Sequence, residues 1–134
     1  MAFYLVRASY TADAIKAMVA DPQDREAAAR AAIEALGGTL HQFFFAFGDR
    51  DLVAICEVAD DKTMAAGSFV ISSTGAFSKM ETTKLLTTAE AMEALNTAKG
   101  ATAAYVPPTG LILAIGVYLL LLAVLIAATT TRNA

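Results

Sequence analysis

The feature that most constrains this chain is an uncharged stretch near its C-terminus, GLILAIGVYLLLLAVLIAA, residues 110–128. Its length of about 19 residues, at roughly 1.5 Å rise per helical residue, matches a hydrocarbon core about 30 Å thick. A helix buried inside a globular protein normally keeps a polar stripe, and this stretch has none. We therefore predict a transmembrane helix over residues 110–129; the alternative is a very apolar core helix.

The position of this segment favours a single-pass tail anchor. Only TTTRNA follows it, and the N-terminal MAFYLVRASY lacks the cationic start and long apolar run of a signal peptide. Lys99 on one side and Arg132 on the other give no clear orientation by the positive-inside rule. We expect a bacterial inner-membrane protein whose N-terminal domain is cytoplasmic.

Small residues in this helix suggest helix–helix contacts, because transmembrane helices associate where backbones approach closely. Gly110 and Ala114 have the small-xxx-small spacing, and the other small residues follow a second stripe. Tyr118 lies near mid-span, where its hydroxyl needs a partner from another subunit, a lipid or a pigment. The expected contacts with other transmembrane helices are Gly110, Ala114, Gly116, Tyr118, Ala123 and Ala127; the alternative is a chance pattern in an Ala- and Leu-rich segment.

The remaining composition excludes several function classes. The net charge of -3 gives no basic face for nucleic acid. The single cysteine, Cys56, cannot form an internal disulfide and is expected to be a small buried hydrophobe. With one histidine and one cysteine, no zinc motif exists, and Asp49 and Asp51 supply too few oxygens for a hard cation. We predict no metal and no cofactor.

Hydrophobic alternation predicts strands over residues 2–10, 39–47, 52–58 and 76–86. Thr11 can cap a short helix over 12–20. Asp21 and Pro22 have N-cap and N1 chemistry for a helix ended by Gly37 and Gly38.

Two further helices complete the pattern. Asp60 or Asp61 starts one that Gly75 stops, and Thr87 and Glu90 form a capping box for a helix over 88–99 that Gly100 closes. The order βαββαβ predicts an α+β, ferredoxin-like fold with an antiparallel four-stranded sheet over residues 1–100. Residues 101–109 are a linker, and residues 130–134 a short tail.

The run LHQFFFAF raises the question of what covers the sheet. Alternation predicts Phe43, Phe45 and Phe47 on one face and Phe44 on the other. Helices cover only one face of such a sheet, and an exposed apolar face usually marks a binding surface. We expect the free face to pair with a second copy about a twofold axis, or with another subunit.

Four stretches carry a family resemblance: FYLVRASYT, EALGG, FFFAFGDRDLVAICEVAD and TTKLLTTAEAMEAL. Over about residues 2–108 the chain resembles the GYD domain, a group within the dimeric α/β-barrel superfamily. The Gly-x-Tyr-Asp-like turn of that family corresponds here to Gly48-Asp49-Arg50-Asp51, with Arg50 at the tyrosine position. The resemblance implies the ferredoxin-like fold. It names no activity, because that superfamily includes oxygenases, small-molecule binders and proteins without known chemistry.

Polar residues within the strands are the candidates for chemistry. Alternation groups Arg7 with Phe3 and Leu5, His41 with Phe43 and Phe45, and Glu57 with Val53 and Ile55. If these groups share a face, the histidine and the carboxylate could perform acid–base work; ordinary cross-strand ion pairs are the alternative. A ligand cleft formed by Tyr4, Arg7 and His41 is a further possibility, with Tyr4 and Tyr10 otherwise amphipathic core residues. No catalytic residue is assigned.

These observations predict a non-catalytic accessory subunit of a bacterial inner-membrane complex, such as a photosynthetic or respiratory one. Its helix would dock on other helices and its domain would cap the cytoplasmic side. The alternative is a membrane-tethered homodimeric α/β-barrel that binds or transforms a small molecule.

Overall fold

The computed structural model describes the backbone of residues 1–132 and the side chains of residues 1–108 and 114–128. These form two compact units, Met1–Ala91 and Met92–Ala134.

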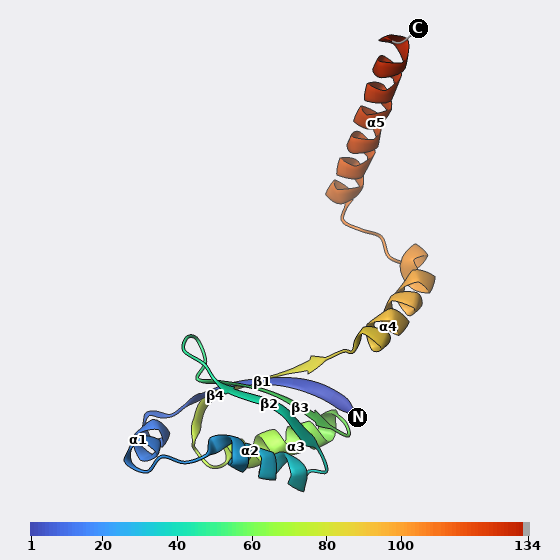
Figure 1. The fold of residues 1–134 in the computed structure, drawn as a ribbon. Helices are drawn as coiled ribbons and strands as arrows, with labels where there is room; N and C mark the ends of the chain where they lie inside the picture. Colours follow the sequence, from blue (N-terminus) through green and yellow to red (C-terminus); the bar gives the residue numbers. More distant parts are fainter. Residues whose placement is uncertain (133–134) are drawn as a thin grey trace. The chain divides into compact units, whose positions relative to one another are not determined.

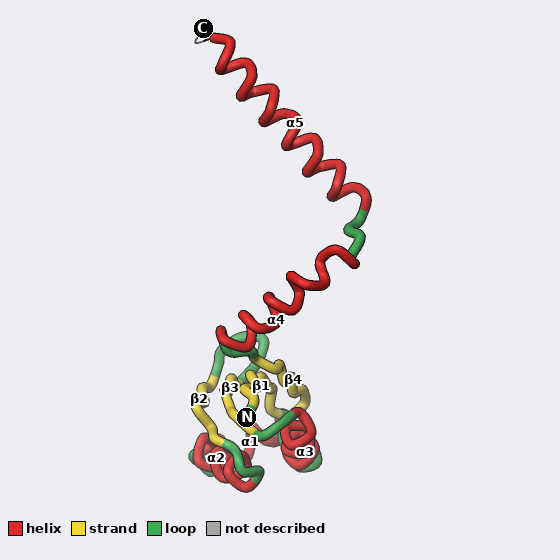
Figure 2. The backbone as a smooth tube through the Cα atoms, turned by 90° about the vertical axis from the view of Figure 1, so that its right-hand side faces the viewer, coloured by secondary structure: helices red, strands yellow, loops and turns green. Residues whose placement is uncertain are grey.

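The first unit is an antiparallel four-stranded sheet with helices on one face. Along the chain its elements are β1 (Ala2–Tyr10), α1 (Ala12–Ala20), α2 (Arg25–Ala35), β2 (Thr39–Phe45), β3 (Leu52–Val58), α3 (Asp61–Ser72) and β4 (Phe77–Leu85). The strand order is β2-β3-β1-β4, and every neighbouring pair is antiparallel. Helices α2 and α3 lie side by side beneath the same face (Figure 1 and Figure 2). The predicted α+β, ferredoxin-like fold is confirmed.

Side-chain caps define where the helices begin. Thr11 caps α1, as the sequence predicts. Of the two candidates for α3, Asp60 is the cap and Asp61 is the first helical residue. The prediction of Asp21 as the cap of α2 is wrong, because Asp24 accepts the hydrogen bond from the Ala27 backbone N–H at 2.9 Å. Asp24 has the same capping chemistry as Asp21 and lies directly before Arg25, the first residue of α2, so the helix starts later than Pro22.

The core lies between the sheet and helices α2 and α3. Strict alternation buries four residues of β3, and β1 contributes three more; the core residues are Tyr4, Ala8, Tyr10, Ile33, Leu40, Leu52, Ala54, Cys56, Val58 and Met64. Cys56 is buried with its Sγ 3.9 Å from the Met64 Sδ, so it packs as a small hydrophobe as expected. Burial of each large apolar side chain contributes roughly 1.5–3 kcal/mol.

A β-bulge in β2 changes which side chains share a face. Leu40 pairs with Cys56 while Gln42 pairs with Ile55, so His41 is an extra residue on this strand. His41 therefore lies on the open face with Glu57, and the prediction that places it with Phe43 and Phe45 is wrong. Phe47 does not join them either. It follows the end of β2 and is fully exposed.

The second unit contains most of α4 (Thr88–Ala101), a 3-10 turn (Thr102–Ala104) and α5 (Thr109–Arg132). The predicted capping box forms, since the Thr87 N–H donates to Glu90 and the Glu90 N–H donates to Thr87. Helix α5 spans the predicted segment 110–129. Within the described residues no helix is long and apolar enough to cross a membrane, so the predicted transmembrane span is not supported.

Candidate functional site: an apolar cavity and an open sheet face

Tyr4 lies on the helix-covered face of β1 and bridges to α3. Its hydroxyl donates a hydrogen bond of 2.5 Å to the Asp61 carboxylate, which also pairs with the Lys84 Nζ at 2.8 Å. Burial, reinforced by the hydrogen bond to Asp61, raises the pKa of Tyr4 to about 12. The Lys84 and Tyr4 hydrogen bonds lower the pKa of Asp61. Tyr4 therefore joins β1 to α3 as a neutral donor.

His41 lies at one end of the open sheet face. Its Nε2 is 2.9 Å from the Glu57 carboxylate, and its ring is 5.3 Å from the ring of Phe3. This is the histidine–carboxylate pair that the sequence suggests, and it lies on an exposed strand end. No further polar group adjoins it among the interactions that the structure describes.

Arg7 lies at the other end of the open face, in a charge cluster with Glu81 and Arg50. The Arg7 guanidinium is 3.2 Å from Glu81, and Arg50 makes two contacts with the same carboxylate, at 3.1 and 2.9 Å. Arg50, then Arg7 and Lys79, lower the pKa of Glu81. The structure therefore does not bring Tyr4, Arg7 and His41 together.

Arg50 and Asp51, in the turn between β2 and β3, hold this hairpin to the rest of the sheet. The Arg50 side chain is mostly buried and pairs with Glu81 of β4. The Asp51 carboxylate accepts a hydrogen bond of 2.8 Å from the Tyr10 backbone N–H, and the Asp51 backbone N–H donates one to the Ala8 carbonyl oxygen. Only the pairing of β1 between β3 and β4 creates these contacts, so sequence alternation could not identify them.

The open face presents an apolar centre between the two polar ends. The cross-strand register places Leu5 beside Ile55 and Thr83, and Val53 beside Phe44. Phe44 is 59% exposed although it is a large hydrophobe in mid-strand. The first unit offers no cover for this face within its described residues. The face has the character of a docking surface.

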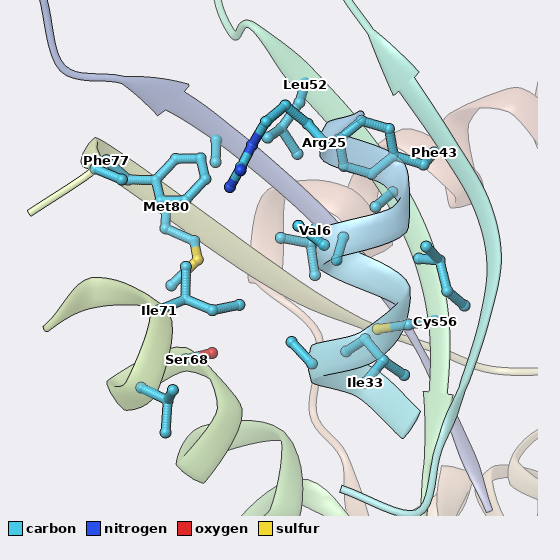
Figure 3. A pocket seen from close by; sticks show the side chains of 18 of the residues that line it. Val6, Arg25, Ile33, Phe43, Leu52, Cys56, Ser68, Ile71, Phe77 and Met80 are labelled. Carbon is cyan, nitrogen blue, oxygen red and sulfur yellow. The ribbon is translucent and has the colours of Figure 1, made fainter. Parts of the chain in front are cut away.

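A cavity of about 260 Å³ lies on the opposite, helix-covered face. Its wall is almost entirely apolar and comes from the sheet, α2 and α3 (Figure 3). The residues that form its interior include Val6, Ile33, Ala54, Cys56, Ile71 and Met80. The sequence suggests a ligand cleft at Tyr4, Arg7 and His41, and none of these residues lines this cavity.

Aromatic rings and one cation surround one end of the cavity. The Tyr10 ring stacks on Phe77 at 4.6 Å and lies 6.4 Å from Phe45, which in turn meets Phe43 edge-on at 5.8 Å. Arg25, the first residue of α2, extends its guanidinium across this end toward Phe77 (Figure 3). Burial raises the pKa of Tyr10, and the neighbouring Arg25 opposes that increase.

The chemistry of these sites is binding chemistry. Within the described residues, no three histidine, cysteine or acidic side chains gather to hold a metal ion. The cavity offers a guanidinium and hydroxyls, without a nucleophile paired to a base.

The residues expected to contact other membrane helices lie in α5. Ala114, Gly116, Tyr118, Ala123 and Ala127 are exposed. The surroundings of Gly110 lie outside the described residues. A Cβ added at Gly116 would meet nothing within 4 Å, so a neighbouring helix has room to approach.

The sheet order and the helix-covered cavity define a ferredoxin-like α+β domain. The chain belongs to the GYD domain family, whose model matches residues 4–95. No curated protein matches it.

Three solved structures are similar to the domain. "FFRP-DM1" is 12% identical, with 64% of this chain and 100% of that chain covered at a TM-score of 0.42. TTHA0845 from Thermus thermophilus is 18% identical, with 65% and 95% covered at 0.45. The hypothetical protein PHS023 from Pyrococcus horikoshii is 12% identical, with 65% and 92% covered at 0.41.

Proposed function

We propose that this protein is a non-catalytic accessory subunit of a bacterial inner-membrane complex, anchored through α5. The observation that carries the proposal is the apolar surface of that helix. Ile115, Val117, Leu119, Leu120 and Leu125 are each more than half exposed, and residues 110–128 carry no charge. Each such side chain gains roughly 1.5–3 kcal/mol when it leaves water, which favours a bilayer or partner helices around it.

The small residues of α5 favour docking on partner helices over a helix that only anchors the domain in the membrane. Gly116 leaves its position open, and Ala114 and Ala123 present little side chain, so a second helix can pack closely. Tyr118 is 66% exposed, and a hydrogen-bonding partner subunit would satisfy its hydroxyl in an apolar medium.

The open sheet face supplies the second docking surface. Its apolar centre around Leu5, Val53 and Ile55, with polar groups at both ends, suits an isologous contact with a second copy. In an assembled complex another subunit would take that place, so the domain caps the cytoplasmic side.

The test is purification of the tagged full chain from its native membranes in mild detergent. We expect larger membrane proteins to co-purify with it. A variant in which residues 110–128 are replaced by a leucine helix should stay in the membrane and lose those partners, because it lacks the small-residue positions. Retention of the partners by the leucine variant, or recovery of the native chain without membranes, would contradict the proposal.

A second candidate function is small-molecule binding by the GYD domain as a tethered homodimer. The cavity of about 260 Å³ between sheet and helices favours it. The two functions are compatible in one chain, since the cavity and the open face lie on opposite sides of the sheet.

A further inference from the structure

We propose that the cavity binds a small apolar monocarboxylic acid, with its carboxylate at Arg25 and its apolar body between the sheet, α2 and α3. The proposal rests on the second candidate function and names its ligand class. It is independent of the role of α5.

The size of the cavity limits the ligand. A volume of about 260 Å³ holds about nine groups of water size, at roughly 30 Å³ each. A medium-chain fatty acid or a phenyl-substituted short acid fits this range. A nucleotide or a long-chain lipid does not.

The lining excludes strongly polar ligands. Val6, Ile33, Ala54, Ile71 and Met80 offer no hydrogen bond to a ligand body. A sugar or a polyol placed there would leave hydroxyls unpaired, at a cost of about 1–3 kcal/mol each. The body of the ligand must therefore be apolar.

The charge of the ligand follows from Arg25. Arg7, Arg30 and Arg50 each pair with a carboxylate. Among the described residues Arg25 has no ion pair, and its side chain donates a hydrogen bond to the neutral Gln23 at 3.3 Å. Arg25 is half-buried at the end of an apolar cavity, and its guanidinium favours a carboxylate, which it can bind with two hydrogen bonds.

The groups around Arg25 suit a ligand whose carboxylate lies at Arg25 and whose apolar body lies in the cavity. The Tyr10 hydroxyl lines the same end of the cavity beside Arg25, and a tyrosine hydroxyl can donate a second hydrogen bond to an acid. The nearby Asp51 carboxylate is occupied by the Tyr10 backbone N–H. The stacked rings of Tyr10 and Phe77 give the apolar part of the ligand a flat wall.

The experiment is calorimetric titration of the full chain in lipid nanodiscs at neutral pH, with empty nanodiscs subtracted. The probes are octanoate, octan-1-ol and octylamine, which share a body and differ in the head group. We expect octanoate to bind most tightly. Arg25→Gln should weaken octanoate binding at least tenfold and leave octan-1-ol binding unchanged. Lys16→Gln, an equal charge change on the exposed face of α1, should alter neither.

A cavity-filling variant locates the site. Ala32→Phe should abolish binding of all probes while circular dichroism shows an unchanged fold; Ala28→Phe serves if the first variant does not fold. If octanoate and octan-1-ol bind equally and Arg25→Gln changes neither, the carboxylate assignment is wrong and small-molecule binding stands. If no probe binds the native chain, this inference is overturned; probes of other chemical classes then decide the second candidate function.

Discussion

Gly38 must be a glycine because neighbouring atoms leave no space for a side chain, and its backbone conformation does not require one. It lies where the chain leaves α2 and enters β2, packed against the Glu57 carbonyl oxygen. A Cβ there would lie 2.6 Å from the Val58 Cγ1 and 3.0 Å from the Ile33 Cγ2. Only a glycine lets α2 pack this tightly onto β3.

Gly38→Ala should destabilise the domain by about 1–3 kcal/mol, because the helix must move away from the sheet to admit a methyl group. The measurement is the free energy of unfolding in urea. The matched control is Gly48→Ala in the β2–β3 turn, where an added Cβ meets nothing within 4 Å. Equal stabilities of the two variants would refute the packing account.

Tyr4→Phe tests the buried hydrogen bond to Asp61. We expect a loss of about 1 kcal/mol at neutral pH. The folded pKa of Tyr4, about 12, lies above its ordinary value of 10.0. The hydrogen bond of Tyr4 therefore contributes fully to the free energy of unfolding below pH 10, and this contribution is lost as the pH rises toward 12. The variant should lack that part of the alkaline decline in unfolding free energy.

The control for this pH dependence is Tyr105→Phe, since Tyr105 is 70% exposed. Parallel stability curves for the native chain and Tyr4→Phe between pH 10 and 12 would show that Tyr4 does not couple folding to pH.

At the scale of elements, β2 decides what the sheet presents on each side. Its bulge sends Phe43 and Phe45 toward the helices and His41 to the open face. Phe43 lines the cavity, and Phe45 packs against the rings of Tyr10 and Phe43. Strands β1 and β3 then supply the apolar centre of that face.

Ile55→Glu should weaken self-association at least tenfold, because Ile55 lies at the middle of the open face, opposite Leu5 and Gln42. The measurement is sedimentation of the full chain in detergent over a range of concentrations. Val19→Glu is the control, since Val19 is 77% exposed on α1 and away from the sheet. If Ile55→Glu leaves the dimer unchanged, or if the native chain is monomeric at every concentration, the open face does not bind a second copy of this chain.

At the scale of the whole molecule, the proposed anchor predicts an orientation. An epitope before Met1 should be protected from protease in intact spheroplasts and digested in inverted vesicles, because the proposed subunit caps the cytoplasmic side of its complex. Digestion of this epitope in sealed spheroplasts would place the domain on the other side of the membrane. A tag after Ala134 should show the reverse pattern.

Local chemistry allowed most elements to be predicted from the sequence. Alternation located the four strands, Thr11, Asp60 and the Thr87–Glu90 pair marked helix starts, and the uncharged run marked α5. These signals succeed because strand periodicity and capping depend on residues only a few positions apart. The prediction of Asp21 as the α2 cap is wrong because Asp24, three residues later, offers the same local chemistry.

Only the tertiary structure decided how the functional groups combine. The bulge in β2 places His41 on the open face instead of the helix-covered face. Because β1 lies between β3 and β4, Arg7 lies opposite Glu81 of β4 and forms its ion pair there, and not with Glu57 of β3. The cavity brings Arg25, Tyr10 and Phe77 together from separate elements. Register and packing depend on contacts between distant segments, and a one-residue shift reverses every side chain of a strand, so no local pattern contains that information.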